Sequence, residues 1–205
     1  MKRKINIIED IDGKKTVFIH DIIFKGKKYI NWDDVERYLQ QYVGEFYNIK
    51  DCNKVVYIGK DLPDEYTHSK YTRILKGANA KAKANVVQGL PELLQIASNE
   101  IYEENRKEKH IKNAKYGWYS YDARFALPVF GDDEEIERYN VFNVALLVRH
   151  DADGKHYLYD IMKIKKENYI IKYIENNAGP EDNRHFRVSF YTFRRKKVRI
   201  LYPTI

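Results

Sequence analysis

Histidine, lysine, arginine and tyrosine side chains gather in and around one stretch of the chain, residues 107–130, KEKHIKNAKYGWYSYDARFALPVF. Histidine titrates near neutral pH and serves as a general acid or base, while lysine and arginine hold phosphate oxygens. Metal-free cleavage of RNA needs a base for the 2′-hydroxyl, an acid for the leaving oxygen and fixed cations for the phosphorane. The side-chain types in this stretch therefore match that reaction.

Strand geometry suggests which of these side chains could meet. Arg124 alternates with apolar residues and is expected to project away from the core. Arg149 and His150 end the next strand, and an antiparallel return would bring them toward the start of the first strand. His110, Tyr116 and Arg124 are thus predicted to converge on one concave surface with Arg149 or His150. The predicted catalytic residues are His110, Tyr116, Arg124, Arg149 and His150.

The net charge of +7 is concentrated at the C-terminus. The chain has 37 Lys and Arg against 30 Asp and Glu, and seven of the basic residues but no acidic ones lie in 183–205, so residues 1–182 hold 30 of each sign. Clustered cations with interleaved aromatic rings suit phosphate and base contacts. The predicted nucleic-acid contacts are Lys109, Lys115, Trp118, Arg187, Arg194, Arg195, Lys196, Lys197 and Arg199. The alternative to nucleic-acid binding is that these cations only face solvent. The basic tail would then be a sheet edge whose charges deter aggregation, and residues 107–112 would be a solvated helix end.

Several other functional classes lack their sequence signatures. The chain has no GxGxxG or Walker A loop and no HExxH or GxSxG motif. A metal between His150 and His156 would need a third ligand that the sequence does not indicate, so surface histidines are preferred, and no metal or cofactor is predicted. The single cysteine, Cys52, forms no internal disulfide. No apolar run approaches the ~20 residues of a membrane span, and the N-terminus lacks a signal-peptide pattern, so we expect a cytoplasmic protein without a membrane partner.

The elements that must position these side chains run from helices to strands. A hairpin is predicted over residues 5–26 around Gly13, a helix over 31–49 capped by Asn31, a strand over 54–59 and a loop over 60–69. Helices over 78–88 and 90–105 precede strands at about 117–130, 138–150 and 155–166, whose short polar linkers favour an antiparallel meander. Residues 167–177 fit a helix or a strand, and a basic hairpin ends the chain. This order predicts an α+β fold with a small hairpin-plus-helix subdomain at 1–60 and the helices and antiparallel sheet at 61–205.

Four features carry a resemblance to a known group: His110, AKYGWY at 114–119, RFALPV at 124–129 and VRHDADGKHYLYDI at 148–161. Roughly residues 70–167 resemble the large polyvalent-protein-associated and MuF-type toxin-like domains of phages and conjugative elements. Those domains are similar to the superfamily that unites barnase, EndoU, colicin-type RNases and RelE. Its members place one or two helices before a four-stranded antiparallel sheet, and many cleave RNA without a metal.

The resemblance implies a mobile-element protein with a metal-independent ribonuclease-like domain that acts on host RNA. It implies catalytic groups at the helix–sheet junction and on the exposed sheet face, where His110, Tyr116, Arg124, Arg149 and His150 are the matching positions. One alternative is a non-catalytic module that binds nucleic acid or a host defence protein as an anti-defence inhibitor. Another is a structural or packaging accessory of the phage or element. RNA is the expected partner ahead of DNA.

Overall fold

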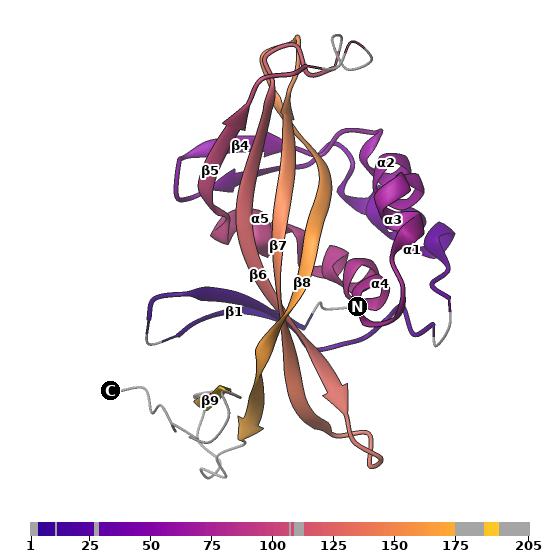
Figure 1. The fold of residues 1–205 in the computed structure, drawn as a ribbon, viewed down its shortest axis with the longest axis vertical. Helices are drawn as coiled ribbons and strands as arrows, with labels where there is room; N and C mark the ends of the chain where they lie inside the picture. The colour runs from indigo at the N-terminus through magenta and orange to yellow at the C-terminus, as the bar shows by residue number, and fades with distance from the viewer. Residues whose placement is uncertain are drawn as a thin grey trace.

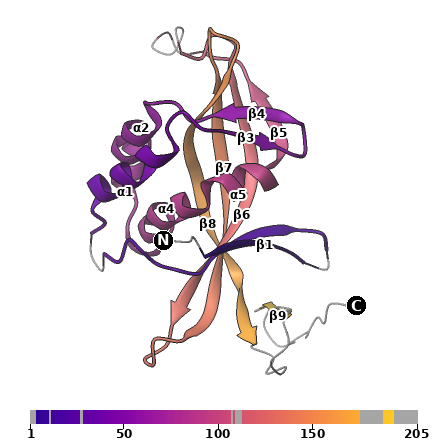
Figure 2. The same cartoon turned by 180° about the vertical axis from the view of Figure 1, so that it is seen from behind.

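The fold is a curled, mostly antiparallel sheet with helices against it (Figure 1). The computed structural model describes residues 4–10, 12–26, 29–106, 108, 113–174 and 187–192, of which 168–174 and 187–192 are described by their backbone. Figure 2, the view from behind, shows α4 (Gly77–Val86) and α5 (Leu90–Ile96) lying across the long central strands. The predicted α+β class is confirmed.

The central strands β6 (Trp118–Phe130), β7 (Ile136–His150) and β8 (His156–Ile174) pair antiparallel in sequence order. Side chains alternate between the two faces of a strand, so Tyr121, Phe125 and Leu127 all turn to the main core. All three are buried as predicted, whereas Tyr119 is half-buried at the end of the same row. The opposite face of β6 carries Trp118, Asp122 and Arg124.

The first 60 residues contribute strands to both edges of this same sheet. β2 (Lys15–Ile19) pairs parallel with β6, and β1 (Ile5–Glu9) pairs antiparallel with β2. On the other side, β4 (Lys54–Tyr57) pairs parallel with β8, and β3 (Phe46–Ile49) pairs antiparallel with β4. Strands from residues 1–60 therefore belong to the same sheet as the central strands.

The helix predicted over residues 31–49 is shorter than expected. Its start is as predicted, because the Asn31 side chain accepts a hydrogen bond from the Asp33 backbone N–H and caps α1 (Trp32–Leu39). A 3₁₀ turn follows at Gln40–Tyr42, and Gly44 then adopts a φ of +92°, which redirects the chain into β3. The helical pattern beyond Leu39 thus ends in the 3₁₀ turn at Tyr42, and Phe46, Tyr47 and Ile49 lie in β3.

Two other local predictions are wrong. Residues 60–69 are not a loop, since they contain α2 (Leu62–His68), which has Pro63 in its first turn, and α3 (Lys70–Ile74) follows. The helix predicted over 90–105 ends at Ile96, because Ala97 adopts an extended ψ of 139° and the chain continues as β5 (Ser98–Glu103) along β6. Ile101, expected on the core face of that helix, is consequently 54% exposed.

The ambiguous segment after Lys166 is a strand over its described part, which ends at Ile174. β8 continues to Ile174, and β9 (Arg187–Thr192) pairs antiparallel with its end. The second half of the predicted C-terminal hairpin lies outside the described residues.

A buried ion pair joins α4 to β8. The Lys83 ammonium lies 2.6 Å from Asp160 Oδ1, and each side chain is only 2% exposed. The Tyr66 hydroxyl donates to the Lys83 backbone carbonyl over 2.6 Å, and Lys83 Nζ lies 4.4 Å from the centre of the Tyr66 ring. The Ile161 N–H also donates to Asp160 Oδ1. This pair is therefore both desolvated and hydrogen-bonded within the main core.

Candidate functional site

Two histidines stack at the end of the β7–β8 hairpin. His150 and His156 are direct cross-strand partners, and their ring centroids lie 4.1 Å apart at an interplanar angle of 22°. The intervening turn is closed by the Asp151 N–H donating to the Lys155 carbonyl and by Gly154, whose φ is +79°. A tight turn of this kind fixes the register, so the two rings are held together by the backbone.

Two tyrosines flank the histidine pair. The Tyr116 N–H donates to the His150 carbonyl, and the His150 N–H donates to the Gly117 carbonyl, so the start of β6 is tied to the end of β7. The Tyr116 ring lies 4.9 Å from the His150 ring, and the Tyr119 ring lies 5.1 Å from the His156 ring. We call His150, His156, Tyr116 and Tyr119 the histidine–tyrosine cluster. Tyr116 is 44% exposed, so an aromatic face borders solvent here.

A charged group supports the inner side of the cluster. Lys54 Nζ lies 3.8 Å from the centre of the Tyr119 ring and 2.6 Å from Glu100 Oε2. The Tyr121 hydroxyl donates to the same Glu100 oxygen over 2.6 Å. Desolvation opposes ionisation of Glu100, but the hydrogen bonds from Lys54 and Tyr121 outweigh it and hold the pKa of that carboxyl below its usual range. Glu100 is therefore an anion at neutral pH that fixes Lys54 beside the rings.

The two histidines differ in their surroundings. Burial, together with the neighbouring His150 and Lys54, lowers the pKa of His156 to about 4. His156 Nε2 is buried and has no hydrogen-bond partner among the described residues. His156 is thus a neutral imidazole at pH 7, with a ring nitrogen free to exchange a proton with a ligand that reaches it.

Arg149 lies outside the histidine–tyrosine cluster. It precedes His150 in β7, so strand alternation sends its side chain to the opposite face of the sheet. There its guanidinium pairs with Asp61 at the start of α2, lies 3.4 Å from Asp151 and covers the Tyr157 ring at 5.3 Å. These contacts make Arg149 a link between β7 and α2.

Arg124 also lies outside the cluster. Its guanidinium makes two hydrogen bonds to Glu167, of 2.8 and 3.1 Å, and a third of 3.2 Å to Asp10, and the residue is 6% exposed. It stands six positions along β6 from Trp118, the cross-strand partner of Arg149, which is about 20 Å at the rise of a strand. The predicted convergence of Arg124 with Tyr116 and with Arg149 or His150 therefore does not occur. Of the predicted catalytic residues that the structure describes, Tyr116 and His150 are brought together.

The predicted nucleic-acid contacts are dispersed. Lys115 Nζ lies 5.2 Å from the centre of the Tyr116 ring, close to the cluster. The Trp118 indole donates to Asn105 and packs edge-on against Tyr159 on the other sheet face. Arg187 begins β9, of which the backbone is described. Several predicted positions lie outside the described residues: Lys109, His110, Arg194, Arg195, Lys196, Lys197 and Arg199.

The cluster contains residues that were not assigned a catalytic role from the sequence. His156 was detectable, because the turn at Asp153-Gly154 predicts that it lies opposite His150. Lys54 and Glu100 carry no local signal, because they reach the cluster from segments that pair with β8 and β6 only in the folded sheet.

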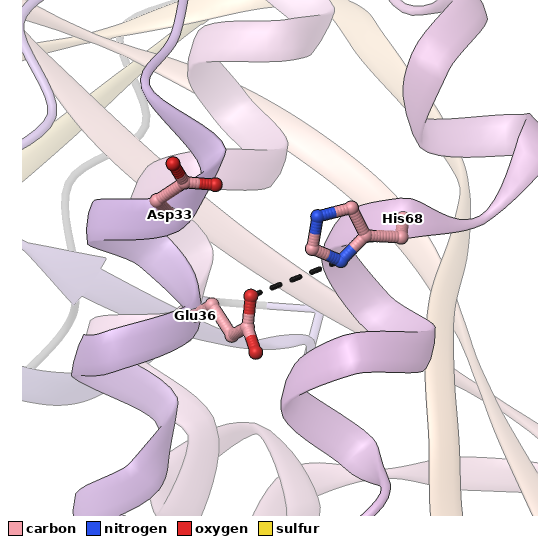
Figure 3. A group of neighbouring side chains, drawn as sticks. All are labelled: Asp33, Glu36 and His68. Atoms are coloured by element: carbon pink, nitrogen blue, oxygen red, sulfur yellow. Dashed lines mark ion pairs between the residues drawn. The ribbon is translucent and has the colours of Figure 1, made fainter.

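A second group with metal-ligand side chains joins α1 to α2 (Figure 3). Asp33 and Glu36 of α1 and His68 of α2 place one ligand atom each within 4.8 Å of one another. Zinc ligands bind at about 2.0–2.2 Å and therefore approach one another to roughly 3.5 Å, which is closer than this spread. His68 Nδ1 is already 3.1 Å from Asp64 and 3.8 Å from Glu36. The contact between His68 and Glu36 connects the two helices, and the contact between His68 and Asp64 lies within α2.

Comparison with known proteins finds no family model, curated protein or solved structure that matches this chain. Among the described residues, no helix combines the length and apolar character that crossing a membrane requires. Function is therefore inferred from the chemistry of the site.

Proposed function

We propose that the protein is a metal-independent endoribonuclease with the histidine–tyrosine cluster as its active site. The observation that carries this proposal is the stacked pair of His150 and His156 beside the exposed Tyr116 ring. The resemblance of residues 70–167 to phage and conjugative-element domains supports host RNA as the substrate. A cytoplasmic site of action accords with that substrate.

The proposed reaction is transesterification at phosphorus. Neutral His156 accepts the proton of the 2′-hydroxyl, whose oxygen attacks the adjacent phosphate, and His150 acts as the general acid that donates a proton to the departing 5′-oxygen. The products are a 2′,3′-cyclic phosphate and a free 5′-hydroxyl, so the reaction consumes no water. Tyr116 offers a face on which a base stacks, and Lys115 supplies positive charge near the phosphorane.

The test is cleavage of end-labelled RNA by the purified protein in the presence of a chelator. His150→Ala and His156→Ala should each lower the rate by about 10²–10⁴-fold, the usual effect of losing a general acid or base. His68→Ala is the matched control, because His68 is an exposed histidine on α2 and should leave the rate unchanged. Products that lack a cyclic phosphate, or cleavage that survives both cluster substitutions, would refute the proposal.

A non-catalytic module that binds nucleic acid or a host defence protein is the second candidate. It is favoured by the carboxylate partners of Arg124 and Arg149, which leave neither guanidinium directed at a substrate phosphate. Wild-type protein that binds RNA without cleaving it would select this candidate over the enzyme. Tyr116→Ala should then still weaken RNA binding, because stacking is worth about 1–3 kcal/mol per base. If the protein does not bind RNA but binds a host defence protein, the result would support the anti-defence inhibitor.

A further inference from the structure

A cleft of about 940 Å³ opens beside β6, away from the histidine–tyrosine cluster. Strand pairing explains why it forms there. The β5 register ends at Asp122, and the β2 register begins at Phe125, so neither strand pairs with β6 at Ala123 and Arg124. The end of α5, the β1–β2 turn and the β3–β4 turn border this gap, and β8 closes its far side. The cleft is therefore a break in the sheet edge.

Five lysines from three separate parts of the chain line the cleft: Lys14, Lys15, Lys50, Lys165 and Lys166. All five are exposed, and Lys15 lies 3.9 Å from Glu9. Within the described part of the chain, no carboxylate lies within 4.0 Å of the ammonium groups of the other four. Their convergence is hidden in the sequence, because residues 1–182 carry equal numbers of basic and acidic side chains.

The balance of charge in the cleft favours an anion. With Arg124, six basic side chains face three acidic ones: Asp51, Asp122 and Glu167. Glu167 is already neutralised by two hydrogen bonds from Arg124, and Asp122 accepts one from Asn99. A concave surface with an excess of one sign of charge attracts the opposite charge. The available cations are thus the lysines on the rim.

The lining also indicates which part of a nucleic acid fits. The cleft has no aromatic side chain among its described lining residues, so it offers no platform for stacking a base. The aromatic side chains lie instead along β5 and β6 toward the cluster, where the Tyr102 and Tyr119 rings are 5.3 Å apart. Tyr119 and Ala123, which lines the cleft, lie on the same face of β6 four positions apart, or about 13 Å. One strand of RNA can therefore reach both surfaces.

We infer that this cleft binds the phosphate backbone of single-stranded RNA whose bases engage the histidine–tyrosine cluster. The choice of RNA as the ligand rests on the proposed function. The cleft adds a second contact surface for the same RNA, and this surface does not depend on the RNA sequence. Lys14, Lys165 and Lys166 hold phosphates at the rim. The cleft thereby positions the strand, while the chemistry takes place at the other end of β5 and β6.

The test uses a short fluorescent oligouridylate with methylated 2′-oxygens, which cannot be cleaved by the proposed reaction. Its affinity is measured by anisotropy over a range of salt concentrations for the Lys14→Gln/Lys165→Gln/Lys166→Gln variant. The control variant replaces three exposed lysines outside the cleft, Lys60, Lys76 and Lys81. Each phosphate contact on a single strand contributes about 0.7 to the slope of log affinity against log salt, so the cleft variant should lose about 2 from the slope and about 100-fold in affinity at ~0.1 M salt.

Inorganic tripolyphosphate serves as a second probe that does not depend on the RNA function. At matched ionic strength it should raise the melting temperature of the wild-type protein and the control variant but not of the cleft variant. This result without any RNA cleavage would support the cleft and refute the ribonuclease. If cleavage depends on His150 but the salt slope of the cleft variant is unchanged, the proposal of RNA binding by the cleft is refuted and the ribonuclease proposal is retained. Wild-type protein that binds neither probe would also overturn the cleft.

Discussion

Removing one partner of the buried Lys83–Asp160 pair should strongly destabilise the protein. Lys83→Met leaves the Asp160 carboxylate in a site where its side chain is 2% exposed and the Ile161 N–H is the remaining described donor. Burial already raises the pKa of Asp160 and lowers that of Lys83, so each charge depends on the other. Loss of a buried partner typically costs about 3–5 kcal/mol, and we expect that decrease in the free energy of unfolding.

The double variant Lys83→Met/Asp160→Leu should recover most of this loss. Apolar side chains of similar volume avoid the desolvation cost of both charges, and such replacements are often neutral. Urea denaturation followed by circular dichroism measures all four members of the cycle, with Lys81→Met as the control on the exposed side of α4. A single variant within about 1 kcal/mol of wild type, or a double variant as unstable as the two single losses combined, would refute the reasoning.

Three further predictions concern pH, an ion-pair network and the tail. The unfolded chain protonates His156 below about pH 6.5 and the folded chain only near pH 4. The free energy of unfolding should therefore fall as pH drops through this window, and His156→Phe should remove about 1 kcal/mol of that fall after solvent screening. Arg124→Met should lower the free energy of unfolding by about 3 kcal/mol in urea denaturation, because it leaves the carboxylates of Asp10 and Glu167 without their cation. A loss of activity in Arg124 variants would therefore reflect a loss of stability. Replacing residues 194–197 with alanine should lower the salt slope of RNA affinity by about 3, and an unchanged slope would assign them to a solvated edge.

Local signals in the sequence were sufficient to predict much of the central sheet. Alternation placed Tyr121 and Phe125 in the core and Arg124 on the other face, and the Asp153-Gly154 turn placed His150 opposite His156. The same rule of alternation, applied one residue further, separates Arg149 from His150. The predicted convergence was wrong for a different reason, because Arg124 lies about 20 Å along β6 from the strand end at Trp118.

Long-range features had no comparable signal. β5 has a sequence compatible with a continued helix, and its strand conformation depends on pairing with β6. The burial of Arg124 depends on carboxylates 114 positions before it and 43 positions after it. Single-sequence patterns report local periodicity, so neither these partners nor the parallel attachment of β2 and β4 follows from them.

The parallel edges of the sheet bear on how the protein folds during synthesis. Val17 pairs with Phe125, 108 positions later, and Val56 pairs with His156, 100 positions later. At about 5–20 residues per second, the N-terminal hairpins wait roughly 5–20 s on the ribosome before their partner strands exist. During that interval β2 and β4 present unpaired edges that can bind other strands. Chaperones that act on nascent chains should therefore raise the yield of this protein more than they raise that of a fold with local pairing.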